Sequence, residues 1–275
     1  MNTQVISNYS RLKPSLLFIP FFILISIVFF LYTQQALNPN AYIHIQKSTF
    51  LYINAQLAHY PGLLDNLTQF GNALIGMSFL SIFIYYAPAI WESLISGSLI
   101  SLIVASSLKK IFTIPRPAAA LEHHSFNIIG QHLSGHNSLP SGHSITIFTT
   151  LTVLMFALMP RKIHRRYVWI FLITGAGLLV AFTRVGIGAH YPLDVLTGST
   201  VGFACGLTGI LLNRKYNIWA WVGSKKFYPF FIFLLIICGV VMMDKILEQQ
   251  LLVYYLALAA QVFTVFKLTN VYFKK

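Results

Sequence analysis

The sequence predicts an all-α fold, a polytopic bundle of transmembrane helices that forms a single integral membrane domain over residues 1–275. Two observations predict this class. Of the 275 residues, 56% are hydrophobic and only 9% are charged, whereas soluble domains carry roughly 25% charged residues. Apolar runs of about 16 to 21 residues also recur along the chain, and about 20 helical residues cross a hydrocarbon core of about 30 Å.

Eight apolar runs are interpreted as helices. They cover residues 15–35, 67–86, 89–109, 143–159, 167–185, 193–212, 228–243 and 251–268. The first is long for the apolar region of a signal peptide, and no small-residue cleavage site follows it, so we interpret it as an uncleaved transmembrane helix. The last two are short, so they form either a hairpin of two spans or one span and one interfacial segment.

Between the first two runs, residues 36–66 carry apolar side chains at helical spacing, namely Ile45, Phe50, Ile53 and Leu57. This pattern predicts an amphipathic helix at the membrane interface. An ordinary outer loop is the alternative.

The basic residues determine the predicted orientation. A net charge of +13 would suggest a nucleic-acid partner in a soluble protein. Here the basic residues lie in short clusters between apolar runs, so we expect no nucleic-acid binding and interpret the clusters as topology signals. With eight alternating spans and a cytoplasmic N-terminus, 13 of the 19 Lys and Arg residues lie on the cytoplasmic side and six on the other, with both termini in the cytoplasm.

Three polar segments lie beside predicted helix ends, and this topology places all three on the outer face. They are residues 109–117 (KKIFTIPRP), residues 140–143 (PSGH) and residues 183–194 (TRVGIGAHYPLD). Their common placement predicts one site.

The first candidate function of this site is to bind an anion. Lys109, Arg116 and Arg184 supply three cations, and the planar arginine fork suits phosphate oxygens. Ser141 and Gly142 precede a predicted helix, whose N-terminus offers N–H groups and a positive dipole end to an anion.

The second candidate function is phosphoryl transfer. His190 and Asp194 are four residues apart, so on one helical face the carboxylate can orient the imidazole. His143 brings a second imidazole to the same surface. Two histidines, one a nucleophile and one an acid, suffice for phosphoryl transfer through a covalent intermediate.

Other clusters favour structural interpretations. Cys205 and Cys238 lie inside apolar runs without metal or redox spacing, so we expect two free thiols. The loop at 118–139 is rich in histidine but matches no familiar metal motif, so a polar lid or a headgroup contact is favoured over zinc. Glycines repeat every four residues and predict close helix packing within the bundle, with a dimer contact as the alternative: Gly198, Gly202 and Gly206.

The pattern Lys-x6-Arg-Pro, Pro-Ser-Gly-His and Arg-x5-His-x3-Asp resembles the type-2 phosphatidic-acid phosphatase superfamily. The resemblance covers about residues 67 to 212, including the stretch LTQFGN at 67–72. Thr183 stands where the family normally has Ser before Arg, which keeps the hydroxyl. The resemblance implies a six-helix core and no cofactor or metal, and it says nothing about the additional hydrophobic segments at 228–268.

The resemblance also implies a role for each site residue. His190 attacks phosphorus, Asp194 holds the other ring nitrogen, and His143 protonates the leaving oxygen and then activates water. The phosphoryl oxygens are bound by the remaining matched residues: Lys109, Arg116, Ser141, Gly142 and Arg184.

We therefore expect a membrane lipid phosphatase of a bacterial inner membrane, with its site facing the periplasm or exterior. Candidate substrates are undecaprenyl diphosphate, phosphatidylglycerol phosphate, phosphatidic acid and a lipid A phosphate. A lipid phosphotransferase with the same intermediate is the near alternative. A transporter is the alternative of another class, but transporters place charge near the bilayer midplane, and these runs are almost free of charge. The oligomeric state stays open.

Overall fold

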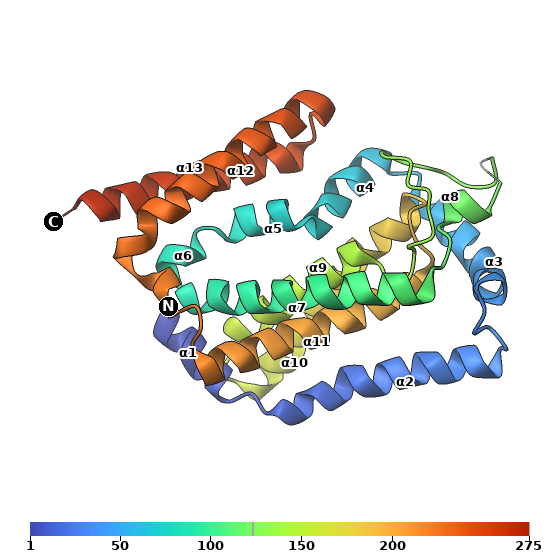
Figure 1. Cartoon of the computed structure of the whole chain (residues 1–275), viewed down its shortest axis with the longest axis horizontal. Coiled ribbons are helices and arrows are strands. Elements are labelled where there is room, and N and C mark those ends of the chain that lie inside the picture. The colour runs from blue at the N-terminus through green and yellow to red at the C-terminus, as the bar shows by residue number, and fades with distance from the viewer. Residues whose placement is uncertain (123, 275) are drawn as a thin grey trace.

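The computed structural model describes residues 1–122 and 124–274. The chain forms a bundle of helices, with both termini at one end of the molecule (Figure 1). The first half contains these elements: α1 (Asn2–Ser10), η1 (Pro14–Leu17), α2 (Phe18–Thr33), α3 (Pro39–Leu57), α4 (Pro61–Thr68), η2 (Gln69–Gly71), α5 (Ala73–Leu80), α6 (Phe83–Tyr86), α7 (Pro88–Phe112) and α8 (Pro117–Ala120). The second half contains the others: α9 (Gly142–Ala157), α10 (Ile163–Gly186), α11 (Pro192–Tyr216), η3 (Ala220–Gly223), η4 (Lys225–Phe227), α12 (Tyr228–Gln249) and α13 (Leu252–Phe273).

Within the described residues, six segments are long and apolar enough to cross a membrane. They are Pro14–Thr33, Pro88–Ala120, Ile163–Gly186, Pro192–Tyr216, Lys225–Gln249 and Leu252–Phe273. The chain is therefore an all-α polytopic membrane protein, as predicted. The two C-terminal helices have 22 residues each, so both runs that looked short are full-length helices of a hairpin. Helix α9 has 16 residues and is shorter than the six.

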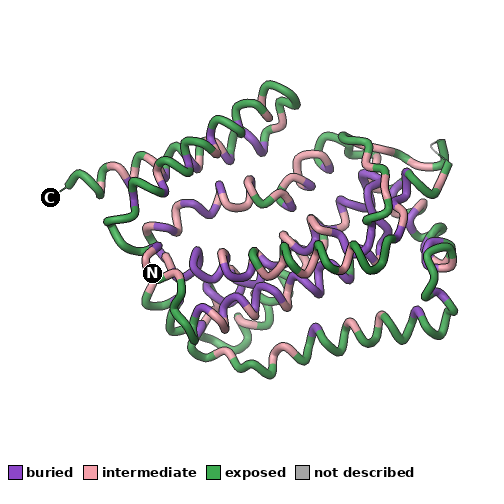
Figure 2. The backbone as a smooth tube through the Cα atoms, in the orientation of Figure 1, coloured by how far each residue is buried: buried purple, intermediate pink, exposed green. Residues whose placement is uncertain are grey.

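The core of the bundle is formed by α7, α9 and α11, where the buried residues concentrate (Figure 2). Helix α11 lies so close to α9 that a Cβ at Gly198 would come within 2.6 Å of the Ser141 carbonyl oxygen. A Cβ at Gly202 would come within 2.4 Å of the Ile145 oxygen. The repeated glycines therefore pack helices within the chain, as predicted, because only a missing side chain permits this approach.

The predicted single helix at 67–86 is wrong. The chain here forms α4, η2, α5 and α6, because Asn72 adopts an extended backbone and its side chain accepts a hydrogen bond from Leu74 N, which starts a new helix. The polar side chains of this broken segment bind the hairpin. Ser78 Oγ accepts from Gln261 Nε2 at 2.7 Å, and Ser81 Oγ lies 2.7 Å from Thr264 Oγ1. Apolar content alone did not reveal these breaks.

Residues 39–57 form a helix, which excludes the loop alternative there. Its buried face differs from the predicted one, since only Phe50 of the four apolar residues is fully buried. The other positions of this face at a spacing of four residues are polar or amphipathic: Tyr42, Gln46 and Asn54. Asn54 donates to the carbonyl oxygens of Val185 and Gly186, so α3 is tied to the end of α10.

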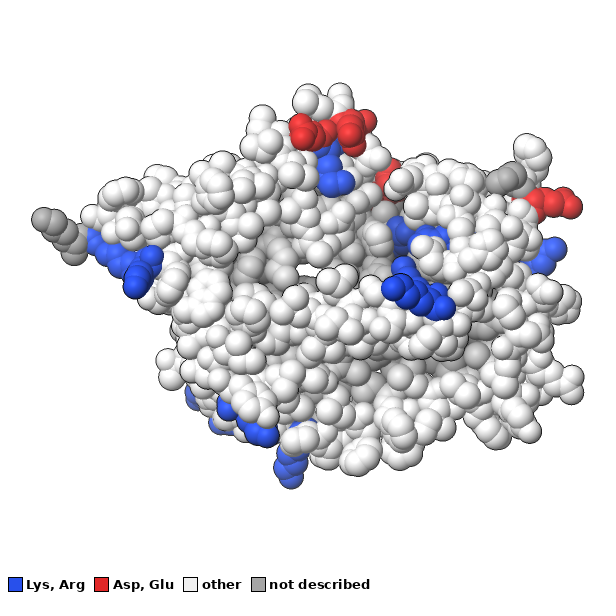
Figure 3. All heavy atoms as spheres, viewed as in Figure 1, with Lys and Arg blue, Asp and Glu red and all other residues white. Residues whose placement is uncertain are grey.

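The helices alternate between two ends of the molecule. At one end, Asn8 Nδ2 donates to the Ala157 oxygen, and Arg214 Nη1 donates to the Leu12 oxygen. The three motif segments lie at the other end. Charged side chains gather in a few groups with broad uncharged surface between them (Figure 3), as expected for helices that contact lipid.

Candidate active site

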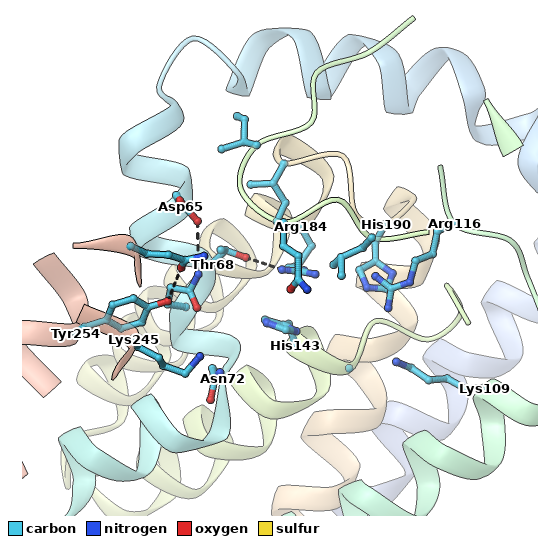
Figure 4. A pocket seen from close by; sticks show the side chains of 17 residues that line it. Asp65, Thr68, Asn72, Lys109, Arg116, His143, Arg184, His190, Lys245 and Tyr254 are labelled. Carbon is cyan, nitrogen blue, oxygen red and sulfur yellow. Dashed lines mark hydrogen bonds between the residues drawn. The ribbon is translucent and has the colours of Figure 1, made fainter. Parts of the chain in front are cut away.

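The three motif segments converge on a cavity of about 330 Å³ (Figure 4). The C-terminal end of α7 contributes Lys109, and the segment after it contributes Arg116. The N-terminal end of α9 contributes Gly142 and His143, while Arg184 and His190 come from the end of α10 and the turn after it. The predicted convergence on one site is therefore present in the fold.

His190 and Asp194 form a buried pair behind this cavity. His190 Nδ1 lies 3.5 Å from Asp194 Oδ2, and the side chains are 1% and 0% exposed. The start of α11 fixes the position of Asp194, because Asp194 Oδ2 also accepts a hydrogen bond from Tyr191 N at 2.9 Å and so caps the helix. His190 itself lines the cavity.

Two further side chains hold Asp194, and the sequence analysis missed both. Ser138 Oγ donates to Asp194 Oδ2 at 2.6 Å, and Tyr42 OH donates to Oδ1 at 2.7 Å. Ser138 Oγ also lies 3.4 Å from His190 Nδ1. Three donors fix the carboxylate, which suits it to orient the imidazole.

Burial lowers the pKa of His190 well below its ordinary value, and the nearby charges of Arg116, Arg184 and Lys109 lower it further. Both effects disfavour the imidazolium form. His190 is therefore a neutral imidazole at neutral pH, the form that carries a free lone pair for nucleophilic attack.

The two arginines keep donors free. Arg116 Nε donates to Asn137 Oδ1 at 2.7 Å, and Arg184 Nη1 donates to Thr68 Oγ1 at 3.1 Å. These bonds orient the guanidinium groups. Among the described residues, buried Arg116 Nη1 and Arg184 Nε have no hydrogen-bond partner. Buried donors are normally paired, so these open positions suit an anion in the cavity.

The start of α9 presents its backbone rather than the Ser141 side chain. Ser141 is fully buried, its hydroxyl accepts from Ser144 Oγ at 2.9 Å, and its N–H donates to the Asp194 carbonyl oxygen. Ser141 is not among the residues that line the cavity, whereas Gly142 and His143 are. The first N–H groups of a helix have no partner within it, so this end can bind an anion.

The turn between Arg184 and His190 explains their spacing. The N–H groups of Ala189 and His190 both donate to the Arg184 oxygen, which folds the chain back over the end of α10. Gly188 allows this turn, because it adopts φ +79 and a Cβ there would come within 2.6 Å of the Asn127 oxygen.

The rest of the cavity wall comes from outside the motifs. The broken segment contributes Asp65, Thr68, Gln69 and Asn72, and the loop after α8 contributes Ile129, Gln131 and Leu133. The hairpin contributes Lys245, Gln249 and Tyr254. These three loop residues form part of the cavity wall, whereas no histidine in the described part of the loop lines the cavity.

No group of three or more His, Cys, Asp or Glu side chains that could hold a metal ion occurs among the residues that the structure describes. His123, one of the candidate ligands in the loop, lies outside the described residues. The donors around the cavity are amines, guanidinium groups and N–H groups, which bind anions rather than cations.

Comparison with known proteins agrees with the geometry. Residues 91–218 match the model of the PAP2 superfamily, and this range contains all eight predicted site residues. One relative is YbjG of Escherichia coli (strain K12), which is named provisionally as an undecaprenyl-diphosphatase. It is 31% identical to this chain over 128 residues, which cover 46% of this chain and 56% of YbjG. An undecaprenyl-diphosphatase of Sulfolobus acidocaldarius is 24% identical over 154 residues, which cover 54% of this chain and 68% of the relative.

The chain thus spans just over half the length of the Escherichia coli relative. Among solved structures, Aquifex aeolicus LpxE is similar to 61% of this chain and 95% of its own, with 26% identity and a TM-score of 0.49.

Proposed function

We propose that this membrane protein hydrolyses a lipid mono- or diphosphate through a phosphohistidine on His190. The match of residues 91–218 to the model of the PAP2 superfamily supports this proposal. The observation that carries the proposal is the buried His190–Asp194 pair beside two guanidinium groups with unpartnered N–H donors. The pair supplies an oriented nucleophile, and the open donors supply a place for a phosphoryl group.

The first chemical step is attack on phosphorus. His190 Nδ1 points to Asp194, so Nε2 carries the lone pair that attacks. The N–P bond forms as the bond between phosphorus and the leaving oxygen breaks, and His143 gives that oxygen a proton. Burial and the nearby cations lower the pKa of His143 in the protein alone, so His143 takes up this proton when the negative phosphate group binds beside it. Asp194 stabilises the positive charge that develops on the His190 ring.

The second step is hydrolysis of the phosphohistidine. His143, now neutral, takes a proton from water as the water attacks phosphorus, and the N–P bond breaks to release inorganic phosphate. In both steps Lys109, Arg116 and Arg184 face the equatorial oxygens, where donors already in place stabilise the developing charge.

The position of the cavity supports a lipid substrate. The cavity is lined by residues at the ends of α7, α9 and α10. In the proposed orientation these helix ends lie at the depth of the lipid headgroups, so a substrate held in the bilayer arrives with its phosphate already positioned. The basic clusters of residues 11–13, 161–166 and 214–215 belong to the opposite end of the molecule. By the positive-inside rule this opposite end is cytoplasmic, so we propose that the cavity faces the periplasm of an inner membrane.

A phosphate-release screen of the purified protein in detergent tests the proposal. The substrates are undecaprenyl diphosphate, phosphatidylglycerol phosphate, phosphatidic acid, a lipid A phosphate and a soluble ester. At least one lipid should exceed the soluble ester by a wide margin in kcat/KM, and activity should persist in excess chelator. Equal values for lipid and ester contradict the lipid preference, and loss on chelation that one metal restores contradicts the metal-free mechanism.

The same screen separates hydrolysis from transfer. Labelled product should appear as inorganic phosphate in water. If label passes instead to an added lipid alcohol or lipid phosphate, the chain is a phosphotransferase with the same intermediate.

A further inference from the structure

The C-terminal hairpin places a cation in the catalytic cavity. Lys245, Gln249 and Tyr254 line the same cavity as His143 and His190, although they lie outside residues 91–218, the part of the chain that matches the superfamily. Figure 4 shows the Lys245 ammonium aimed into the cavity beside Asn72, on the side of His143 away from Arg116. Lys245 lies outside the three motif segments, so the mechanism proposed from those segments gives this cation no role.

The hairpin is fixed to the broken segment, so Lys245 has a defined position. Val253 N donates to Asn66 Oδ1 at 3.0 Å at the tip of the hairpin. Deeper in the bundle, buried Gln261 donates to Ser78 Oγ at 2.7 Å. Buried hydrogen bonds of this kind specify one packing arrangement.

Lys245 forms no ion pair within 4.0 Å in the described parts of the chain, although Asp65 and Glu248 line a neighbouring pocket with it. Its Nζ lies 5.8 Å from the centroid of the Tyr254 ring. Tyr254 OH donates to Gln249 Oε1 at 2.9 Å, which leaves the Gln249 amide N–H groups to donate elsewhere. The Lys245 ammonium and the Gln249 amide can therefore donate hydrogen bonds to phosphate oxygens, as Lys109 and the two arginines do in the proposed mechanism.

The proposed reaction determines what reaches Lys245. Attacking and leaving atoms lie roughly in line across phosphorus, so the leaving group lies opposite His190, where His143 protonates it. The rest of the leaving group then continues past His143, toward Asn72 and Lys245 (Figure 4).

The cavity is also larger than one phosphoryl group requires. Five heavy atoms, at the share of roughly 30 Å³ that one water molecule takes in the liquid, occupy about 150 Å³. The cavity holds about 330 Å³. A second phosphoryl group therefore fits beside the first.

We propose that Lys245, with Gln249 and Asn72, binds the second phosphate of a lipid diphosphate, the one that stays on the lipid. The inference rests on the proposed function and names its substrate class. When His190 takes the terminal phosphoryl group, the bridging P–O bond breaks and its electron pair stays on the departing lipid monophosphate. Lys245 stabilises that charge, and His143 supplies a proton to the bridging oxygen.

The test compares two lipids that differ only by one phosphate, a polyprenyl diphosphate and the polyprenyl monophosphate of the same chain length. In mixed micelles, Lys245→Gln should lower kcat/KM for the diphosphate about tenfold or more, the loss expected for a charge-assisted contact. The value for the monophosphate should change less than twofold. Lys245→Arg should restore most of the diphosphate activity.

Lys110→Gln is the matched control, because Lys110 is an exposed lysine of the same end and does not line the cavity. It should leave the ratio between the two lipids unchanged. Equal losses on both lipids in Lys245→Gln, or no loss on the diphosphate, would overturn the inference.

A binding measurement keeps this test separate from the proposed function. If the wild type hydrolyses neither lipid, the proposed function fails, whereas the second phosphate site is still measured by thermal unfolding. Inorganic diphosphate should raise the Tm of the wild type more than orthophosphate does, and Lys245→Gln should remove that difference. A difference that persists in the variant rejects the site.

Discussion

The motif segments and the outer elements contribute to the cavity in different ways. The motif segments, residues 109–117, 140–143 and 183–194, supply the side chains that face phosphorus in the proposed mechanism. The outer elements are α3, the broken segment at 61–86 and the hairpin α12–α13. They supply partners that hold the first set in place, such as Tyr42 and Thr68, and the cation Lys245.

This difference separates chemistry from positioning. A catalytic histidine works only if its own ring is present, whereas a partner that orients it shares the task with other donors. We therefore expect loss of the nucleophile in the motif segments to abolish turnover and substitutions in the outer elements to change its rate or selectivity.

The largest effect is expected from His190→Ala. Removing the nucleophile should lower kcat roughly 10⁴-fold or more, as in enzymes with a covalent intermediate. Acid-labile label from a phosphorylated lipid should appear on the wild type and not on the variant. His164→Ala, which changes an exposed histidine of α10 far from the motifs, is the control and should retain activity. Substantial turnover by well-folded His190→Ala would exclude the covalent mechanism.

The close approach of α9 and α11 gives the next effect. Gly202→Ala places a Cβ within 2.4 Å of the Ile145 oxygen, so the helices must separate, at a cost of about 1–3 kcal/mol in unfolding free energy. Gly175→Ala is the matched control on α10, because nothing lies within 4 Å of the new Cβ. This control should be neutral or slightly stabilising, since Ala favours helix more than Gly. Equal Tm values for both variants in detergent would contradict the packing.

An outer element is tested by Tyr42→Phe. The change removes one of three donors to Asp194, so kcat should fall about tenfold while KM changes little, because a hydrogen bond to a charged group contributes roughly 1.5–3 kcal/mol. Tyr52→Phe on the same helix removes an exposed hydroxyl and should have no effect. A loss as large as that of His190→Ala would mean that the two regions do not differ in the way described.

The smallest effect concerns pH. The acid limb of kcat/KM reports protonation of free His190, whose lowered pKa keeps the ring neutral at pH values below its usual range. Arg116→Gln removes a charge that lowers this pKa, so the pKa rises and the acid limb should move to higher pH. The position of the limb, not the absolute rate, is the measurement, with Lys110→Gln as the control. A limb that stays in place or moves to lower pH contradicts the assigned nucleophile.

Sequence reasoning predicted much of the fold and several residues that line the cavity, and the roles of these residues stay predictions. Hydropathy predicted eight helical runs, and six of them correspond to the long spans of the described residues, because about 20 apolar residues in a row are a local property of the chain. The spacing of His190 and Asp194 predicted their contact, although His190 lies in the turn before α11 and not on the helix itself. The basic clusters predict which end of the bundle is cytoplasmic, and this orientation stays a prediction. The contacts of Asn8 and Arg214 show that the N-terminus and the ends of α9 and α11 lie at one end.

Other features were decided only by tertiary structure. Tyr42 and Asp194 are 152 residues apart, and no local pattern links them. The broken segment after Asn72 reads as part of one apolar run, and its Ser78 and Ser81 side chains bind partners on α13, more than 180 residues away. The face of α3 was misjudged for a similar reason, because buried Asn54 is satisfied by the distant end of α10.

The sequence by itself therefore determined the membrane class and the spacing of the motif residues, since these depend on composition and on spacings of a few residues. Only the tertiary structure decided which outer elements complete the cavity. The position of Lys245 depends on hydrogen bonds that join the hairpin to residues 66 and 78, and such long-range pairings leave no periodic signal in the chain.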